Sequence, residues 1–291
     1  VMGKTSIVGD KEGWTMEDLK ALMAKYPDAS VFGDTTTRSE LLWMFMMYSG
    51  SQFVNRETGK CSFDSQEFVD LLEFMKQFPE EFDYSALPDD YWMNSQKAYR
   101  DGKILLMSLN ISNVENYITN VGMFGEPVTL IGFPAKEGNG AVITPNNVYM
   151  ISSKSKNPDG AWQFLRYYLT DEYQKDSNDS WTRPIKKDAL REKINKGTEK
   201  PYWINSDGGK EYYEYTTWLG DEEVTLDPLT QEQADDLYNY ICSVTQAYYS
   251  DDSLSNIITE ESAAFFSGQK SAQDVADIIQ SRAQIYINES R

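Results

Sequence analysis

Apolar residues recur at helical spacing along most of the chain, and the segments that carry them begin with helix-capping residues. Thr15 is followed three positions later by Asp18, and Leu19, Leu22 and Met23 then repeat on one helical face. The same signals predict further helix starts at Ser65, Asn157–Pro158, Thr230, Ser253 and Ser271. The pattern therefore predicts a helix-rich chain.

Strand signals are fewer and shorter. Compact apolar runs predict strands over residues 103–109, 128–134 and 148–152. Predicted helices separate these runs, and this alternation is typical of the α/β class. No internal repeat or flexible linker divides the chain.

The charge balance excludes two classes of partner. The 291 residues include 27 Lys and Arg against 46 Asp and Glu, a net charge of −19. A surface this acidic repels phosphate, so we expect binding neither to nucleic acid nor to an anionic membrane surface. The longest apolar run, residues 41–48, is too short to cross a bilayer, so we expect no membrane insertion of this segment.

The residue inventory removes many catalytic and metal sites. The chain has no histidine, which excludes an imidazole base and a His-containing zinc site. Cys61 and Cys242 form no C-x-x-C motif, and we interpret them as small apolar residues rather than a long-range disulfide. Residues 176–180 resemble the start of a calcium loop but lack its glycine and its closing glutamate. We predict no metal and no cofactor.

An enzyme without histidine would rely on carboxylates, Lys, Tyr or a metal, and acidic pairs are plentiful in this chain. Adjacent acidic residues such as Glu80–Glu81 and Asp235–Asp236 would be needed for a glycoside hydrolase. With 46 acidic residues such neighbours arise easily by chance, and most lie on solvated faces or at helix N-termini. Binding is therefore a better prediction than catalysis.

Several aromatic residues lie beside turn-forming and amide residues rather than on helical stripes. Tyr149, Trp181 and Trp218 are of this kind. Flat rings next to amides, carboxylates and guanidinium groups suit sugars, which offer both C–H faces and hydroxyls. The alternative is that each ring is part of the core with a polar tip. Three aromatic residues on helical stripes are instead expected in the core: Trp43, Phe68 and Trp162.

Five segments, taken in order, resemble the bacterial extracellular solute-binding proteins, the sugar-binding family of the maltose-binding type. They are residues 13–19 (a "TW-x-E-L"-like helix start), 99–107 ("G-x-x-A-M"-like), 131–134, 151–165 ("I-S-x-x-S-K-N-x-x-x-A-W-x-F") and 266–276. The resemblance covers nearly the whole chain, and the fourth segment is the most specific.

The resemblance implies an α/β periplasmic-binding-protein-like type II fold of two lobes, here helix-rich and with most of the first lobe missing. Residues 1–142 plus 229–291 would form the second lobe, and residues 143–228 would return to the first. We expect the chain to be a truncated form of a longer protein.

By position, the resemblance and the aromatic pattern together imply a set of ligand-binding residues. They are Arg38, Asn110, Asn113, Asn146, Tyr149, Trp181, Arg183 and Trp218. Family members often carry an aromatic residue where this chain has Asn113. No catalytic residue is predicted.

The implied function is the substrate-binding component of an ABC importer that captures an oligosaccharide and passes it to membrane permease subunits. Its place would be extracellular, either lipid-anchored at the cell surface or periplasmic. Two alternatives remain: a carboxylate-based glycoside hydrolase, and a non-catalytic surface interaction module.

Overall fold

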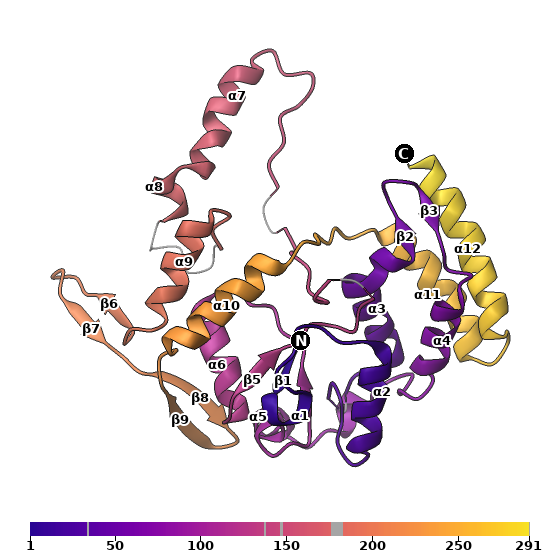
Figure 1. Cartoon of the computed structure of the whole chain (residues 1–291), viewed down its shortest axis with the longest axis horizontal. Coiled ribbons are helices and arrows are strands. Elements are labelled where there is room, and N and C mark those ends of the chain that lie inside the picture. Colours follow the sequence, from indigo (N-terminus) through magenta and orange to yellow (C-terminus); the bar gives the residue numbers. More distant parts are fainter. Residues whose placement is uncertain (34, 137, 146–147, 176–182, 291) are drawn as a thin grey trace. The chain divides into compact units, whose positions relative to one another are not determined.

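The computed structural model covers residues 1–291 and describes all of them except 34, 137, 146–147, 176–182 and 291 (Figure 1). The helices are α1 (Thr5–Val8), α2 (Met16–Lys25), α3 (Arg38–Ser49), α4 (Gln66–Met75), α5 (Tyr91–Arg100), α6 (Val114–Phe124), α7 (Pro158–Leu165), α8 (Asp171–Gln174), α9 (Lys187–Lys196), α10 (Gln231–Ser243), α11 (Asp252–Phe266) and α12 (Ala272–Glu289), with short 3-10 turns η1 (Gly50–Gln52), η2 (Tyr84–Ala86) and η3 (Arg166–Leu169). The strands are β1 (Met2–Lys4), β2 (Val54–Asn55), β3 (Lys60–Cys61), β4 (Leu106–Met107), β5 (Val128–Leu130), β6 (Tyr202–Ile204), β7 (Lys210–Tyr212), β8 (Tyr215–Leu219) and β9 (Glu222–Leu226).

The chain divides into two compact units, each made of three segments. Unit 1 consists of Val1–Asp10, Asp89–Leu130 and Pro145–Thr245, and unit 2 consists of Lys11–Pro88, Ile131–Thr144 and Gln246–Arg291. This division differs from the lobes expected from the sequence, 1–142 plus 229–291 against 143–228. The difference arises because elements from all three segments of unit 1 contact one another. Strand β1 pairs with β4 and β5, α6 packs on β8, and α10 packs on α9.

Unit 2 is a helical unit built around phenylalanine rings. Helices α11 and α12 lie side by side, and α4 packs against both α12 and α3. Phe133 is fully buried and stacks on Phe32 and Tyr48 with ring centroids 5.3 and 4.7 Å apart, while Phe45 meets it edge-on at 5.1 Å. Burying a phenylalanine side chain contributes about 1.5–3 kcal/mol, so this cluster is a large share of the unit's stability.

Four of the six predicted helix starts are capped by the predicted side chain, whereas Ser65 precedes α4 without a side-chain cap hydrogen bond. Thr15, Thr230 and Ser271 each accept a hydrogen bond from the third helical backbone N–H, and the side chain at that position bonds back to the cap. Asn157 caps α7, with Pro158 at the first helical position. These confirmed capping boxes satisfy backbone groups that a helix start otherwise leaves unpaired.

Unit 1 contains a three-stranded antiparallel sheet in the order β4-β1-β5. Met2 lies opposite both Met107 and Leu130, and with Phe124 of α6 it forms a small buried cluster. A second cluster joins α6 to α9 and α10 through Ile118, Ile194 and Leu237. Burial raises the pKa of Tyr117 within this cluster to about 12.

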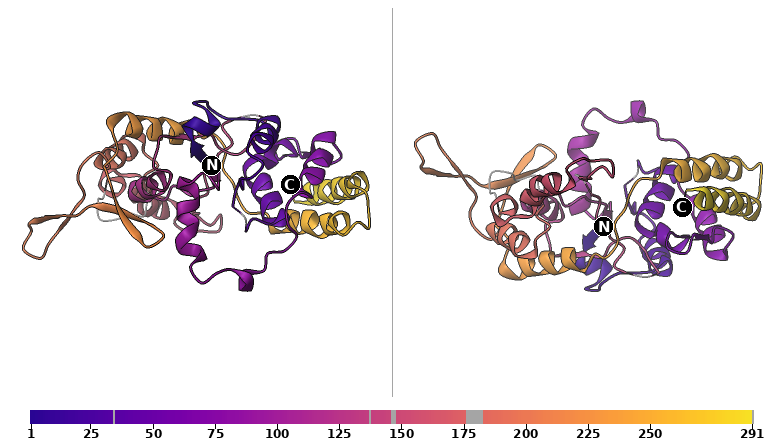
Figure 2. Two further views of the ribbon diagram at one scale, coloured as in Figure 1. Left: turned by 90° about the horizontal axis from the view of Figure 1, so that it is seen from below. Right: turned by 90° about the horizontal axis from the view of Figure 1, so that it is seen from above.

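Two hairpins of unit 1 differ in how they are covered. In β8, Tyr215, Thr217 and Leu219 are buried while Trp218 faces outward, so one face of the β8–β9 hairpin packs on the unit. All six residues of β6 and β7 are exposed. This second hairpin extends away from α9 and α10 in both further views (Figure 2).

Some predicted elements are wrong or shorter than predicted. Residues 148–152 form no strand, and the runs 103–109 and 128–134 contribute only β4 and β5. Helix α11 is capped by Asp251 rather than beginning at Ser253. Phe68 is buried as predicted, but Trp162 is 49% exposed, and no other residue of α7 is buried either.

The structure also bears on the cysteines, on metal sites and on membrane-spanning helices. Cys61 and Cys242 are free thiols. Among the described residues, no group of three or more His, Cys, Asp or Glu is placed to hold a metal ion. Within the same residues, no helix combines the length and apolar character that crossing a bilayer requires.

Candidate ligand-binding site

A groove in unit 2 runs between α3 and α11. It consists of two adjoining cavities of about 380 and 130 Å³, and Met46, Ser255 and Ile258 line both. Small-molecule sites in proteins are concave and largely apolar, with a few polar groups that fix orientation. The groove has this composition, so we take it as the candidate site.

Arg38, one of the predicted binding residues, lines the smaller cavity as the first residue of α3. Its Nε donates to the carbonyl oxygen of Phe78 at 3.2 Å, and its guanidinium lies 5.3 Å from the centre of the Phe266 ring. Glu80 lies 3.8 Å from one of its terminal nitrogens. These contacts hold a fork of N–H donors at the cavity, a geometry suited to hydroxyls or an acidic group.

Trp43 and Ser262 add an apolar face and an unused polar group to the same cavity. Trp43 is 49% exposed, which corrects the prediction that it belongs to the core. Leu41, Leu42 and Phe45 are buried on α3, whereas Trp43 on the same helix keeps about half of its surface exposed. The Ser262 hydroxyl oxygen is buried and has no hydrogen-bond partner among the described residues. A ligand hydroxyl would relieve the cost of that unpaired group.

The larger cavity is bordered by tyrosines and by an ion pair. Tyr248 and Tyr249 line it, and Tyr249 is 64% exposed. Asp251 pairs with Arg56 at 2.6 Å and accepts a hydrogen bond from the Tyr286 hydroxyl at 2.9 Å. Burial on its own raises the pKa of Asp251, but the bonds from Arg56, the Leu254 backbone and Tyr286 together hold that pKa below its usual value.

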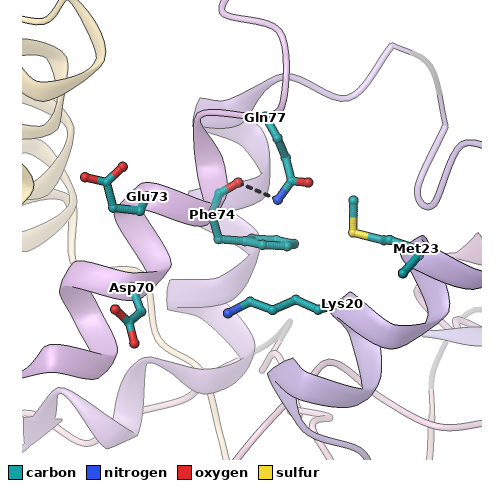
Figure 3. A pocket seen from close by; sticks show the side chains of 7 residues that line it. Lys20, Met23, Asp70, Glu73, Phe74 and Gln77 are labelled. Atoms are coloured by element: carbon teal, nitrogen blue, oxygen red, sulfur yellow. Dashed lines mark hydrogen bonds between the residues drawn. The ribbon is translucent and has the colours of Figure 1, made fainter. Parts of the chain in front are cut away.

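Unit 2 also has a wider, open depression of about 690 Å³ between α2 and α4, which suits a ligand less well. Figure 3 shows Lys20 and Met23 of α2 facing Phe74 of α4, and Gln77 donating to the Phe74 carbonyl at 2.9 Å. The Phe74 ring is only 6% exposed, and the Lys20 ammonium lies 5.9 Å from its centre. No open aromatic face is therefore offered by Phe74.

Three predicted residues of unit 1 come together at the start of α6. Arg183 Nη2 donates to Asn110 Oδ1 at 3.5 Å, and Arg183 and Asn113 line a pocket of about 160 Å³. Asn113 caps α6 by accepting a 2.7 Å hydrogen bond from the Asn116 backbone. Apolar side chains such as Leu190 and Ile194 form much of the lining. The pocket is small, and the Asn113 side-chain oxygen already accepts a hydrogen bond from the backbone of α6.

The remaining predicted residues are scattered or lie outside the described residues. Tyr149 is half exposed and stacks on Tyr168 with centroids 4.5 Å apart, and Trp218 is half exposed on β8. Desolvation, then the hydrogen bond with Tyr168, raises the pKa of Tyr149. Asn146 and Trp181 are among the residues that the structure does not describe.

Sequence reasoning missed several groove residues, although one signal was present. Tyr248 and Tyr249 follow Gln246 and precede the capping residue Asp251, so they are aromatic residues beside an amide and a turn. That criterion selected Tyr149 and would also have selected this pair. Ser262 carries no such signal. It lies on α11, and whether it lines a groove depends on which helix packs against α11.

The comparisons with known proteins agree on one class. The sequence model for bacterial extracellular solute-binding proteins matches residues 2–201. No curated protein matches the sequence. Among solved structures, the chain is similar to a periplasmic solute-binding protein from Pectobacterium atrosepticum (16% identity, TM-score 0.51, 99% of this chain and 70% of that one). It is also similar to the cyclic alpha-maltosyl-1,6-maltose binding protein from Arthrobacter globiformis (11% identity, TM-score 0.51, 99% and 69%). These likenesses show the fold, that of the two-lobe periplasmic binding proteins in a helix-rich α/β form.

Proposed function

The chain belongs to the bacterial extracellular solute-binding protein family, and on that premise we propose that it captures an oligosaccharide outside the cell and delivers it to the permease of an ABC importer. The chain is thus a binding protein and not an enzyme, which decides against the glycoside hydrolase considered from its carboxylate pairs. The finer location, anchored at the cell surface by lipid or free in a periplasm, is part of the proposal.

The groove between α3 and α11 is the observation that carries the choice of a sugar. It combines the half-exposed Trp43 ring with the Arg38 fork and the unpaired Ser262 hydroxyl. A pyranose has an apolar C–H face for the ring and hydroxyls for the polar groups. The name of the Arthrobacter protein, which binds a cyclic maltosaccharide, points to the same class of ligand.

The test is isothermal titration calorimetry of the full chain against linear and cyclic maltosaccharides and unrelated disaccharides. We expect one of them to bind reversibly without being hydrolysed. Trp43→Ala should weaken that binding about tenfold or more, because a buried aromatic anchor is worth about 1–3 kcal/mol. Trp92→Ala is the matched control, since Trp92 is an exposed tryptophan on α5 of the other unit.

Two results would count against the proposal in different ways. If none of the sugars binds, the proposed capture of an oligosaccharide in the groove is wrong. If a sugar binds and Trp43→Ala leaves its affinity unchanged while Trp92→Ala also does, the function stands and the groove is not the site.

A further inference from the structure

The β6–β7 hairpin is a second place where aromatic and polar side chains are organised together. It is two-stranded, and all six of its strand residues are exposed. A two-stranded hairpin is marginally stable in water by itself. Contacts among its own side chains must therefore contribute to holding its shape, and they also fix which groups it presents.

One face of the hairpin presents an oriented tryptophan. Trp203 lies opposite Glu211 in the register, and its Nε1 donates to Glu211 Oε2 at 2.8 Å. The Asn205 amide donates to the other carboxylate oxygen at 3.0 Å. Tyr213 stacks on the indole with centroids 5.9 Å apart and planes 23° apart, yet Trp203 stays 55% exposed. The hydrogen bond to Glu211 fixes the edge of the indole and Tyr213 stacks on it, while about half of the Trp203 surface stays exposed.

The opposite face has different chemistry. Tyr202 lies opposite Tyr212, and the Lys210 ammonium lies 3.9 Å from the centre of the Tyr202 ring. A cation thus covers part of the Tyr202 ring. The two faces carry similar aromatic content on the same strands, but only the Trp203 face sets a carboxylate and an amide beside an open ring.

The Trp203 face fits a sugar better than other ligands. An indole surface matches the C–H face of a pyranose, and each carboxylate oxygen has a second lone pair for a hydroxyl. The Glu211 carboxylate disfavours phosphate groups and anionic lipid. A stable protein interface buries about 800 Å² on each partner around an apolar centre, whereas this ribbon divides its rings between two faces.

We propose that the Trp203 face of the β6–β7 hairpin is a second carbohydrate-binding surface, which stacks a pyranose of a longer glycan. The choice of ligand class rests on the proposed function, but the site is separate from the groove of unit 2. A single exposed stacking contact binds weakly, so it contributes where a polymer offers many copies of the ring. The hairpin would raise the local concentration of the chain on polysaccharide.

The experiment is affinity electrophoresis of the full chain through gels containing glycogen, soluble starch, xyloglucan or galactomannan. We expect at least one polymer to retard the wild-type chain. Trp203→Ala should weaken that retardation about tenfold, and Trp203→Phe should retain part of it because the ring remains while the Nε1–H donor is lost. The matched control is Tyr202→Ala on the opposite face, which should behave as wild type.

The outcomes separate this surface from the groove. Trp43→Ala should weaken the calorimetric binding of short oligosaccharides, and Trp203→Ala should leave it unchanged. If short oligosaccharides fail to bind but Trp203→Ala still abolishes retardation, the groove proposal fails and the hairpin proposal stands. The hairpin proposal is overturned if no polymer retards the wild type, if Trp203→Ala migrates as wild type, or if Tyr202→Ala has the same effect as Trp203→Ala.

Discussion

The phenylalanine core of unit 2 and two elements of unit 1, α7 and the β6–β7 hairpin, use aromatic residues in opposite ways. In unit 2, Phe63, Phe68 and Phe133 are fully buried against other rings. In unit 1, Trp162 and Trp203 keep about half of their surface exposed. Unit 2 closes several helices around its rings, whereas α7 and the β6–β7 hairpin of unit 1 have no layer over them within the unit. Aromatic rings therefore stabilise the core of unit 2 and are available for contact on α7 and the β6–β7 hairpin of unit 1.

The largest expected effect comes from removing a ring of unit 2. Phe68 meets Phe53 and Phe63 edge-on, with centroids 5.1 and 5.0 Å away. Phe68→Ala should lower the free energy of unfolding by about 3–5 kcal/mol, because the lost burial is compounded by the cavity left behind. Urea denaturation monitored by circular dichroism measures the loss.

Phe164→Ala is the matched control for that substitution. Phe164 is 67% exposed on α7, so its removal should change the free energy of unfolding by less than about 0.5 kcal/mol. Equal losses for the two variants would mean that α7 is as well packed as α4, and the contrast between the units would disappear.

The second prediction concerns a charge that unit 2 holds at the groove. The bonds from Arg56, Leu254 and Tyr286 depress the pKa of Asp251 in the folded chain, so its contribution is present above an ordinary carboxyl pKa of about 3.9 and is lost as the pH falls through the folded value. Asp251→Asn should cost about 1.5–3 kcal/mol at pH 7, the usual worth of hydrogen bonds to a charged group. Denaturation at pH 7 and at pH 3 should show the gap between variant and wild type closing in acid.

Asp252→Asn provides the comparison, because Asp252 is exposed and accepts a bond from the neighbouring Ser250 hydroxyl. It should differ little from wild type at either pH. A gap for Asp251→Asn that stays constant between pH 7 and pH 3 would show that the carboxylate charge is not what stabilises this position.

Local signals in the sequence predicted local structure well. The capping boxes at Thr15, Thr230 and Ser271 depend on residues three positions apart, so they can be found without knowing the fold. The strand predicted at 148–152 is wrong because an apolar run becomes a strand only where a partner pairs with it. The missed strand β1 makes the same point, since its partners β4 and β5 lie more than a hundred residues away in the sequence.

The lining of the candidate groove was predictable only where position or local chemistry identified a residue. Arg38 came from the family resemblance, and the structure places it in the groove. Trp43 was assigned to the core because periodicity shows that α3 has a buried face but not which residues a neighbour covers. Whether Trp43 faces α11 or solvent is decided by packing between segments more than two hundred residues apart in the sequence.

The smallest expected effect tests the hairpin of unit 1 that does have a covered face. Trp218 lies opposite Glu223 on the outer face of β8–β9, while its neighbour Leu219 is 6% exposed on the inner face. An exposed cross-strand pair is worth about 0.2–1 kcal/mol, so Trp218→Thr, which keeps a β-branched residue in the strand, should lower the free energy of unfolding by no more than that. Leu219→Ala should cost about 2–5 kcal/mol because it opens a cavity. If Trp218→Thr cost as much as Leu219→Ala, the outer ring would be part of the core, and the contrast between covered and open side chains would not hold within unit 1.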